Sequence, residues 1–297
     1  NVIIASLLLL KHLLANSYDV IHSHMFWAER ISIIPGKLTG HRVVFNEHGL
    51  GLWRKWYHVR IMRMISRLAD KVITSCEENY RVRMKREKLD PEKMVVIYNS
   101  FEEDRDIKFS SLSLRDVRDG KFVIGYAGRF NTVKRLGLFL DIAERLKYRI
   151  KDFKIILLGD GDLRYGLERE ISRRGLEEFF EMPGFVLDID PYYRIFDVFV
   201  LPSRVEGFSL ALLEAAAAGI PLIAFDVGGN SEIITNGISG YTIADNDVDG
   251  LAEKIVYLQA NDKYRREMGM AAQRLIREKF SGPKRADHLQ RLYRSLQ

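Results

Sequence analysis

Cysteine, proline and long apolar runs are all scarce in this sequence. Its 297 residues include 1 Cys and 7 Pro. The single Cys76 cannot form an internal disulfide or a cysteine-rich zinc site, and such sparing use of thiols is typical of the reducing cytosol. The most apolar stretch, residues 2–10, ends at Lys11 and is well short of the about 18 residues that a transmembrane helix needs. We therefore expect no transmembrane span and interpret this stretch as a helix that is buried on most sides.

The composition excludes several other classes of protein. Hydrophobic residues make up 47% of the chain and aromatic residues 11%, without low-complexity tracts, which argues against disorder, collagen and coiled coil. The length suggests about two domains. The net charge of +6 permits nucleic acid, an anionic membrane or a phosphate-bearing small molecule as partner.

Short β-branched runs alternate with helix-length amphipathic stretches along most of the chain. This alternation predicts an α/β fold with parallel sheets covered on both faces. Strands are expected at residues 19–24, 42–45, 71–74, 95–98, 122–126, 154–158, 198–201, 221–225 and 241–243. Helices are expected at residues 28–38, 53–68, 77–89, 134–149, 163–173, 208–218 and 251–259. The polar stretch 99–120 carries no sustained period and separates two such series, so we expect two Rossmann-like domains with a ligand cleft between them.

The stretch 201–221 carries the strongest indication of a ligand site. A loop with Glu206 and Gly207 leads from a strand into a helix that begins near Ser209. The N–H groups at such a helix start bind phosphates or sugar hydroxyls, and Gly207 allows close approach of the backbone. Glu214 lies about two turns further along, near the same face of the helix. Two carboxylates that bracket a helix start indicate recognition of a hydroxyl-rich substrate, with solvated surface carboxylates as the alternative.

Two cations stand at the start of the second half. Arg129 follows a strand directly, and Lys134 is expected at the start of the next helix. A cation at a helix N-terminus opposes the macrodipole at a cost of about 0.3–1 kcal/mol, which a bound diphosphate offsets. An ordinary basic surface is the alternative.

These motifs together resemble the retaining GT-B glycosyltransferases of family 4. The resemblance rests on the order and spacing of GRF-x3-K, LLGDG, PGFV, E-x7-E and GGNSEII in the second half, and of DVIHSH and NEHG in the first. It covers most of the chain. The dinucleotide-binding motif GxGxxG is not met, because GDGDLR lacks its third glycine. This argues against a dehydrogenase.

The resemblance implies a role for each matching position. Arg129 and Lys134 hold the nucleotide diphosphate, Glu214 binds the ribose hydroxyls, and His48 faces the donor sugar. Glu206 holds the donor sugar and phosphate together with the backbone of Gly207, Phe208, Ser209 and Leu210. The nucleotide-binding set is completed by Phe185 and Val186, which flank the base through their main chain, and by Gly128.

The resemblance also implies domain boundaries. We expect a partial acceptor-side domain at residues 1–104 that lacks its initial strands, a linker at 105–120, and a nucleotide-sugar-binding domain at 121–282. A C-terminal helix at 283–297 is expected to pack back on the first domain. Arg135 stands where many members have Gly, a departure that affects the loop near the phosphates.

Neither a metal nor a cofactor is expected. The pairs Asp160/Asp162, Asp188/Asp190 and Asp245/Asp247 have DxD spacing, but such pairs are common in loops by chance. His22, His24 and His48 could suggest a metal site, with buried or hydrogen-bonded histidines as the preferred interpretation.

The stretch 53–68 predicts a basic amphipathic helix. Its apolar residues at helical spacing are Trp53, Trp56, Tyr57, Ile61, Met64, Ile65 and Leu68. Its basic residues are Arg54, Lys55, Arg60, Arg63 and Arg67. Such a helix can lie on an anionic membrane, and the alternative is a core-facing stripe with a solvated basic face. Nucleic acid is disfavoured, because no stacking platform or recognised motif is present.

We therefore expect an enzyme that transfers a hexosyl unit from a nucleoside-diphosphate sugar to a hydroxyl of a glycan or lipid-linked acceptor, with retention and without metal. We place it in the cytoplasm, peripheral on the inner face of the membrane, in the synthesis of surface polysaccharide or glycolipid. The alternatives are a sugar phosphorylase or sugar-phosphate synthase on the same fold, and a catalytically silent nucleotide-sugar-binding protein.

Overall fold

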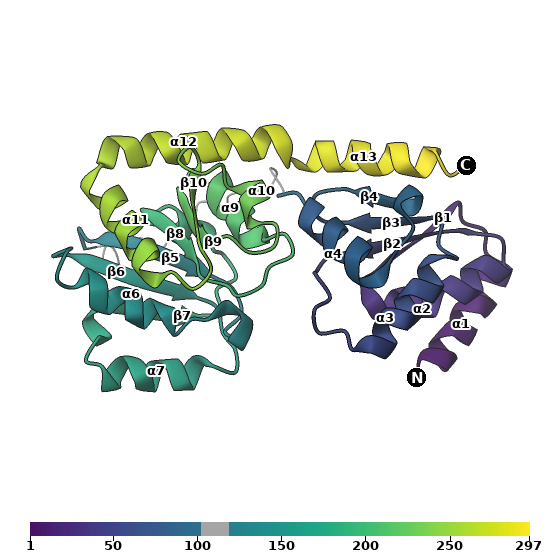
Figure 1. Cartoon of the computed structure of the whole chain (residues 1–297), viewed down its shortest axis with the longest axis horizontal. Coiled ribbons are helices and arrows are strands. Elements are labelled where there is room, and N and C mark those ends of the chain that lie inside the picture. The colour runs from purple at the N-terminus through teal and green to yellow at the C-terminus, as the bar shows by residue number, and fades with distance from the viewer. Residues whose placement is uncertain (102–118) are drawn as a thin grey trace. The chain divides into compact units, whose positions relative to one another are not determined.

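The computed structural model describes residues 1–101 and 119–297, which form two compact units (Figure 1). The first unit contains Asn1–Asn99 and Gly282–Gln297, and the second contains Ser100–Ser281. Most of the linker expected at residues 105–120 lies outside the described residues. No helix in the described ranges combines the length and apolarity needed to cross a bilayer.

The first unit is built on a parallel four-stranded sheet in the order β1-β2-β3-β4. Its strands are β1 (Val20–His24), β2 (Arg42–Glu47), β3 (Lys71–Thr74) and β4 (Met94–Val96). Its helices are α1 (Val2–Ala15), α2 (Met25–Leu38), α3 (Trp56–Ser66), α4 (Glu77–Glu87), the short η1 (Pro91–Lys93) and the C-terminal α13 (Gly282–Arg294).

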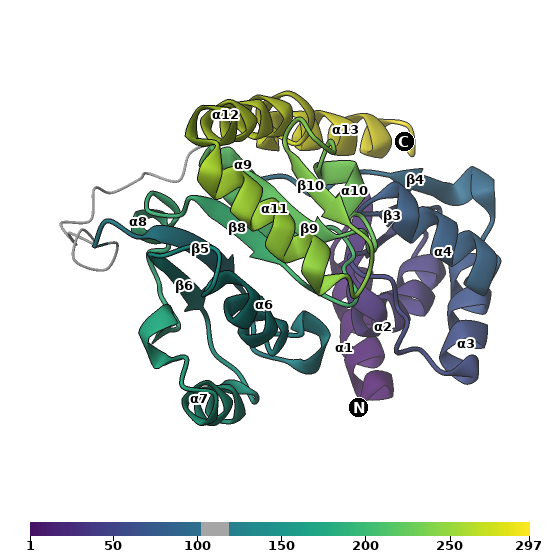
Figure 2. The ribbon, with the colours of Figure 1, turned by 60° about the vertical axis from the view of Figure 1, so that its left-hand side comes forward.

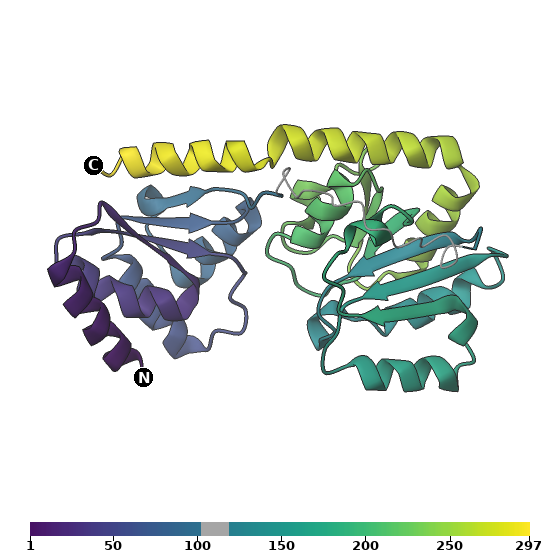
Figure 3. The ribbon, with the colours of Figure 1, turned by 180° about the vertical axis from the view of Figure 1, so that it is seen from behind.

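Alternate residues of β2 point to opposite faces of this sheet, and each face has its own core. Val43 and Phe45 pack with Phe26 of α2 and Met62 of α3. On the other face, Val44 belongs to a cluster that is covered by Leu289 and Leu292 of α13 and by Leu296, which follows this helix. Figure 3 shows α13 along one side of this sheet and α2 and α3 along the other.

The interpretation of the first helix as buried on most sides is wrong. Within α1 only Leu13 is buried, whereas Ile3 is 68% and Leu14 is 74% exposed. The helix packs on α2, to which the Ser6 hydroxyl donates a hydrogen bond at the Ile31 carbonyl (3.1 Å). Because α1 is apolar all round, its sequence carries no information on which side faces a neighbour.

The second unit is built on a parallel six-stranded sheet in the order β10-β9-β8-β5-β6-β7. Its strands are β5 (Phe122–Ala127), β6 (Phe153–Leu158), β7 (Phe180–Gly184), β8 (Val198–Leu201), β9 (Leu222–Phe225) and β10 (Gly240–Ile243). Its helices are η2 (Thr132–Lys134), α6 (Leu138–Leu146), α7 (Arg164–Arg173), η3 (Glu177–Phe179), α8 (Asp190–Tyr193), α9 (Leu210–Ala217), α10 (Asn230–Ile233), α11 (Val248–Ala260) and α12 (Asp262–Lys279). Figure 2 shows α6 and α11 side by side on one face. Every residue of β5, β8 and β9 is buried, as expected of central strands covered on both faces.

One expected helix in this unit is wrong in its start. The sequence predicted a helix at residues 134–149, but η2 ends at Lys134 and α6 begins at Leu138. The break falls at Arg135, whose left-handed backbone (φ 49°) cannot continue a helix. Strand β7 and the short helices α8 and α10 were not anticipated.

Candidate functional site

The strand order places a switch point between β5 and β8. These strands pair at Ile124↔Val198, while the chain runs outward from β5 through β6 to one edge and from β8 through β9 to the other. In open parallel sheets, ligands bind at the carboxyl ends of the strands that flank such a point. The loop after β5 carries Gly128 and Arg129, and the loop after β8 carries Glu206 and Gly207. The predicted residues on these loops therefore lie at the same edge of the sheet, beside the switch point.

An ion pair joins the two loops. Lys134 Nζ lies 2.6 Å from Glu206 Oε1, and the side chains are only 20% and 10% exposed. The Asn131 side chain accepts hydrogen bonds from the backbone N–H groups of Val133 (3.1 Å) and Lys134 (3.2 Å), which fixes the turn that presents the lysine. Lys134 does not stand at the start of α6, so the expected macrodipole penalty does not apply to it. Its charge is compensated by Glu206 instead. Arg129 is exposed.

Glycines allow the loop backbones beside the switch point to touch. A Cβ atom at Gly228, where φ is +56°, would lie 1.8 Å from the Glu206 carbonyl oxygen. A Cβ at Gly159 would lie 2.0 Å from the Gly128 carbonyl oxygen. The glycine motifs of the sequence therefore bring the loops after β5, β6, β8 and β9 into direct contact, which holds the backbone around Glu206 in place.

Helix α9 begins where the sequence predicted. Ser209 caps it, because its hydroxyl accepts a hydrogen bond from the Leu212 N–H (3.4 Å). Phe208 is buried and packs edge-on against Phe280 (5.1 Å between ring centroids), whereas Leu210 is 51% exposed. The backbone from Gly207 to Leu210 is thus anchored on one side by an aromatic contact and leads into the positive end of the helix.

Glu214 is half-buried and has a partner that the sequence did not reveal. The Tyr193 hydroxyl in α8 donates a hydrogen bond to Glu214 Oε2 at 3.0 Å. The residues expected to flank the base lie between β7 and α8, where Phe185 is 74% exposed and Val186 is half-buried. Tyr193 was missed because it joins residues 21 positions apart and belongs to no motif.

In the first unit, His48 lies within a group of histidines. His24 Nδ1 is 2.9 Å from His48 Nε2, and the rings of His22 and His24 are tilted to each other with centroids 4.3 Å apart. Burial lowers the pKa of His48, with His24 and Arg285 acting in the same direction. His48 is therefore neutral near pH 7 and can donate or accept a hydrogen bond. Within residues 1–101 and 119–297, no group of three or more metal-ligating side chains is placed to hold an ion.

The loop that carries His48 is held by a buried ion-pair cluster. Arg83 Nη2 lies 2.9 Å from Glu47 Oε2 and donates to the Gly49 carbonyl (2.6 Å), and Arg83 Nη1 lies 2.6 Å from Glu87 Oε1. Arg54, expected on a basic surface, is 3% exposed and pairs with Glu47 and Glu87 at 2.6 and 2.8 Å. Burial raises the pKa of Glu87 to about 7, against the opposing effect of Arg54.

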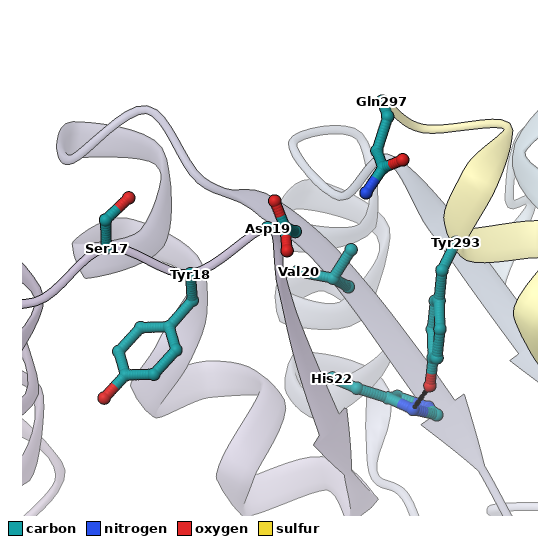
Figure 4. A pocket seen from close by; sticks show the side chains of 7 residues that line it. All are labelled: Ser17, Tyr18, Asp19, Val20, His22, Tyr293 and Gln297. Atoms are coloured by element: carbon teal, nitrogen blue, oxygen red, sulfur yellow. Dashed lines mark hydrogen bonds between the residues drawn. The ribbon is translucent and has the colours of Figure 1, made fainter.

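A separate hollow of about 510 Å³ lies in the first unit, beside the start of β1 (Figure 4). It is lined by Ser17, Tyr18, Asp19, Val20, His22, Tyr293 and Gln297. Its hydrogen bond between His22 Nδ1 and the Tyr293 hydroxyl (2.6 Å) ties β1 to α13. No residue that the sequence predicted for the nucleotide site lines this hollow.

Two parallel sheets, one with glycine-rich loops at its switch point, define the class of Rossmann-like α/β proteins, and two such units in one chain are the GT-B architecture. Residues 114–275 match the family described as "Glycosyl transferases group 1", and residues 1–105 match "Glycosyltransferase Family 4". The chain belongs to the group 1 glycosyltransferases, and its expected fold and transferase activity are confirmed at this level.

Two curated relatives and one solved structure are similar to this chain. It is 29% identical to the UDP-Gal:alpha-D-GlcNAc-diphosphoundecaprenol alpha-1,3-galactosyltransferase of Escherichia coli, over 96% of this chain and 77% of that protein. It is 27% identical to the 2-deoxystreptamine N-acetyl-D-glucosaminyltransferase of Niallia circulans, over 89% of this chain and 73% of that protein. The structure of Anabaena HepE in complex with UDP superposes with a TM-score of 0.86 at 19% identity, covering 98% of this chain and 82% of that one.

Proposed function

We propose that this chain transfers a hexosyl unit from a nucleoside-diphosphate sugar to a hydroxyl acceptor, with retention of anomeric configuration and without a metal ion. The Lys134–Glu206 ion pair at the switch point carries the proposal. A nucleoside diphosphate is already a good leaving group, so the site must chiefly supply fixed positive charge where negative charge develops. Lys134, the exposed Arg129 and the N-terminus of α9 provide it.

The other site residues complete this proposal. Glu206 and the backbone of 207–210 hold the donor sugar, Glu214 binds the ribose hydroxyls, and the main chain of Phe185 and Val186 flanks the base. His48, kept neutral by burial, provides a hydrogen bond for a sugar hydroxyl without adding a positive charge that would oppose the oxocarbenium character of the transition state.

A UDP-sugar is the donor class with the most support. The E. coli relative carries UDP-Gal in its name, and the similar HepE structure contains UDP. The first experiment is calorimetric titration of UDP, GDP and ADP in the presence of EDTA. Tight binding of UDP alone, with EDTA present, supports a UDP-sugar as the donor and a nucleotide site that needs no metal ion. Binding of none of the three by the folded chain contradicts the proposed nucleotide site.

We further propose that the protein acts as a peripheral protein on the cytoplasmic face of an anionic membrane, where it meets a lipid-linked acceptor for surface polysaccharide or glycolipid. The exposed side of α3 and the turn before it supports this. Trp53, Trp56 and Met64 are 59%, 74% and 62% exposed, and Lys55, Arg60 and Arg67 are exposed beside them. Aromatic and basic side chains exposed together are typical of helices that lie in a membrane interface.

A further inference from the structure

Tyr193 links the segment after β7 to the carboxylate of Glu214. Its hydroxyl donates to Glu214 Oε2 at 3.0 Å, and the residue is 3% exposed. Its ring packs against Phe196 and Phe199, with centroid distances of 5.9 and 6.2 Å. A ring enclosed in this way has little rotational freedom, so the position of its hydroxyl is set by the core rather than by the ligand.

We propose that Tyr193 is a positioning residue, which orients the Glu214 carboxylate toward the ribose diol of the bound nucleotide. This proposal rests on the proposed function. A carboxylate offers about four lone-pair positions on its two oxygens, and the tyrosine occupies one of them on Oε2. The ribose of a nucleotide carries two adjacent hydroxyls that can donate to such a carboxylate. Because a phenol is neutral, it fixes the rotamer of Glu214 without adding a positive charge beside it.

The two glutamates of the E-x7-E motif therefore have partners of different kinds. Glu206 pairs with a cation, Lys134, whereas Glu214 accepts from a hydroxyl. Tyr193 also ends α8, which lies in the segment between β7 and β8 that carries Phe185 and Val186. The residues proposed to flank the base and the residue that orients the ribose ligand therefore lie on one segment between two strands.

The test compares UDP with 2′,3′-dideoxy-UDP in calorimetric titrations of Tyr193→Phe. Removal of the single hydrogen bond that the phenol donates to this carboxylate is expected to weaken UDP binding about 3- to 10-fold. Binding of the dideoxy nucleotide is expected to stay unchanged, because that ligand has no hydroxyls for Glu214 to hold. In turnover, the KM for the UDP-sugar rises and kcat does not.

Two controls distinguish orientation from general destabilisation. Tyr192→Phe removes a half-buried hydroxyl from the same helix and is expected to change neither affinity. Tyr193→Phe in a Glu214→Ala background is expected to have no further effect on UDP binding. Equal weakening of both nucleotides, or unchanged UDP binding in Tyr193→Phe, overturns the inference while the proposed function stands. If the folded wild type binds none of UDP, GDP and ADP, the proposed function fails and this inference fails with it.

Discussion

Lys134 Nζ lies 2.6 Å from Glu206 Oε1, and this ion pair connects residues 72 positions apart in the segments that follow two neighbouring strands. Both side chains are largely shielded from water, so their attraction is stronger than that of a surface pair. The pair holds the lysine beside the switch point before any ligand arrives. A bound diphosphate then meets a cation that is already oriented.

Lys134→Ala is expected to lower kcat/KM about 10²- to 10³-fold, because it removes positive charge from the leaving group and leaves Glu206 without its cation. Transferase assays on the purified variant measure this. Lys263→Ala, at a lysine whose side chain is 91% exposed, is the matched control and should leave the rate unchanged. An unchanged rate in Lys134→Ala would remove the ion pair from the mechanism.

Glu214→Ala is expected to weaken nucleotide binding by about 1.5–3 kcal/mol, the range for loss of a charged hydrogen bond. Calorimetric titration measures it. Glu253→Ala, on the exposed side of α11, serves as the control. Unchanged affinity in the Glu214 variant would place that carboxylate outside the site.

Gly228→Ala is expected to destabilise the second unit and to abolish nucleotide binding, because its Cβ would lie 1.8 Å from the Glu206 carbonyl oxygen. Gly237→Ala is a matched control, since Gly237 also has a positive φ (+78°) but open space around its Cβ. Both variants carry the left-handed backbone cost of about 1 kcal/mol, so the difference between their thermal midpoints isolates the clash. Equal thermal midpoints and equal nucleotide affinities in the two variants would contradict the predicted clash at Gly228.

The stability of the first unit is expected to fall in acid because of His22. Burial, with help from His24 and Arg285, lowers the pKa of His22 to about 4 from 6.5. The unfolded chain therefore binds more protons than the folded chain between these values, so the contribution of His22 is present above pH 6.5 and is lost as the pH falls through 4. One such group gives a slope of up to about 1.4 kcal/mol per pH unit.

Between pH 7 and 4, the free energy of unfolding measured with denaturant should fall less steeply for His22→Gln than for the wild type. His288→Gln, at an exposed histidine of α13, should keep the wild-type slope. Burial raises the pKa of Glu87 to about 7, so the contribution of Glu87 to stability grows as the pH falls, opposite to that of His22. All three proteins keep Glu87, so comparing their slopes cancels this contribution. Identical slopes in all three proteins would contradict the role of His22.

Flotation with vesicles should recover the protein when the vesicles contain anionic lipid and not when they are zwitterionic. Arg60→Glu with Arg67→Glu should abolish the preference for anionic lipid, because each basic residue near the surface contributes about 1 kcal/mol. Trp56→Ser should weaken recovery through loss of an exposed interfacial aromatic side chain. Tyr148→Ser, which removes an 84% exposed aromatic from the second unit, should float as the wild type does. Recovery that does not depend on lipid charge would count against the membrane proposal.

The sequence predicted the central strands well, because strands covered on both faces are continuous apolar runs. β3 (Lys71–Thr74) and β8 (Val198–Leu201) begin and end where expected. β7 was not predicted, because FEMPG contains a charge, a proline and a glycine; the segment is a strand since it lies at the sheet edge and pairs with β6 alone. The sequence of α1 likewise could not show which of its apolar sides is left exposed.

For the site, sequence order predicted which loops carry the chemistry, but not which side chains meet. The Lys134–Glu206 and Tyr193–Glu214 contacts depend on the strand order, which a local pattern does not contain. Arg54 shows the same limit. Its position in a basic run predicted a solvated face, whereas tertiary contacts with Glu47 and Glu87 bury it.

The first unit is discontinuous in sequence, since the C-terminal segment 282–297 supplies Leu289, Leu292 and Leu296 to a core formed by residues before position 100. During synthesis the second unit emerges from the ribosome before those leucines do. Val44, Ile73 and Ile97 therefore stay uncovered on one face of the first sheet while nearly two hundred further residues are translated. Chaperones that bind exposed apolar sheets have this whole interval in which to act on the nascent chain.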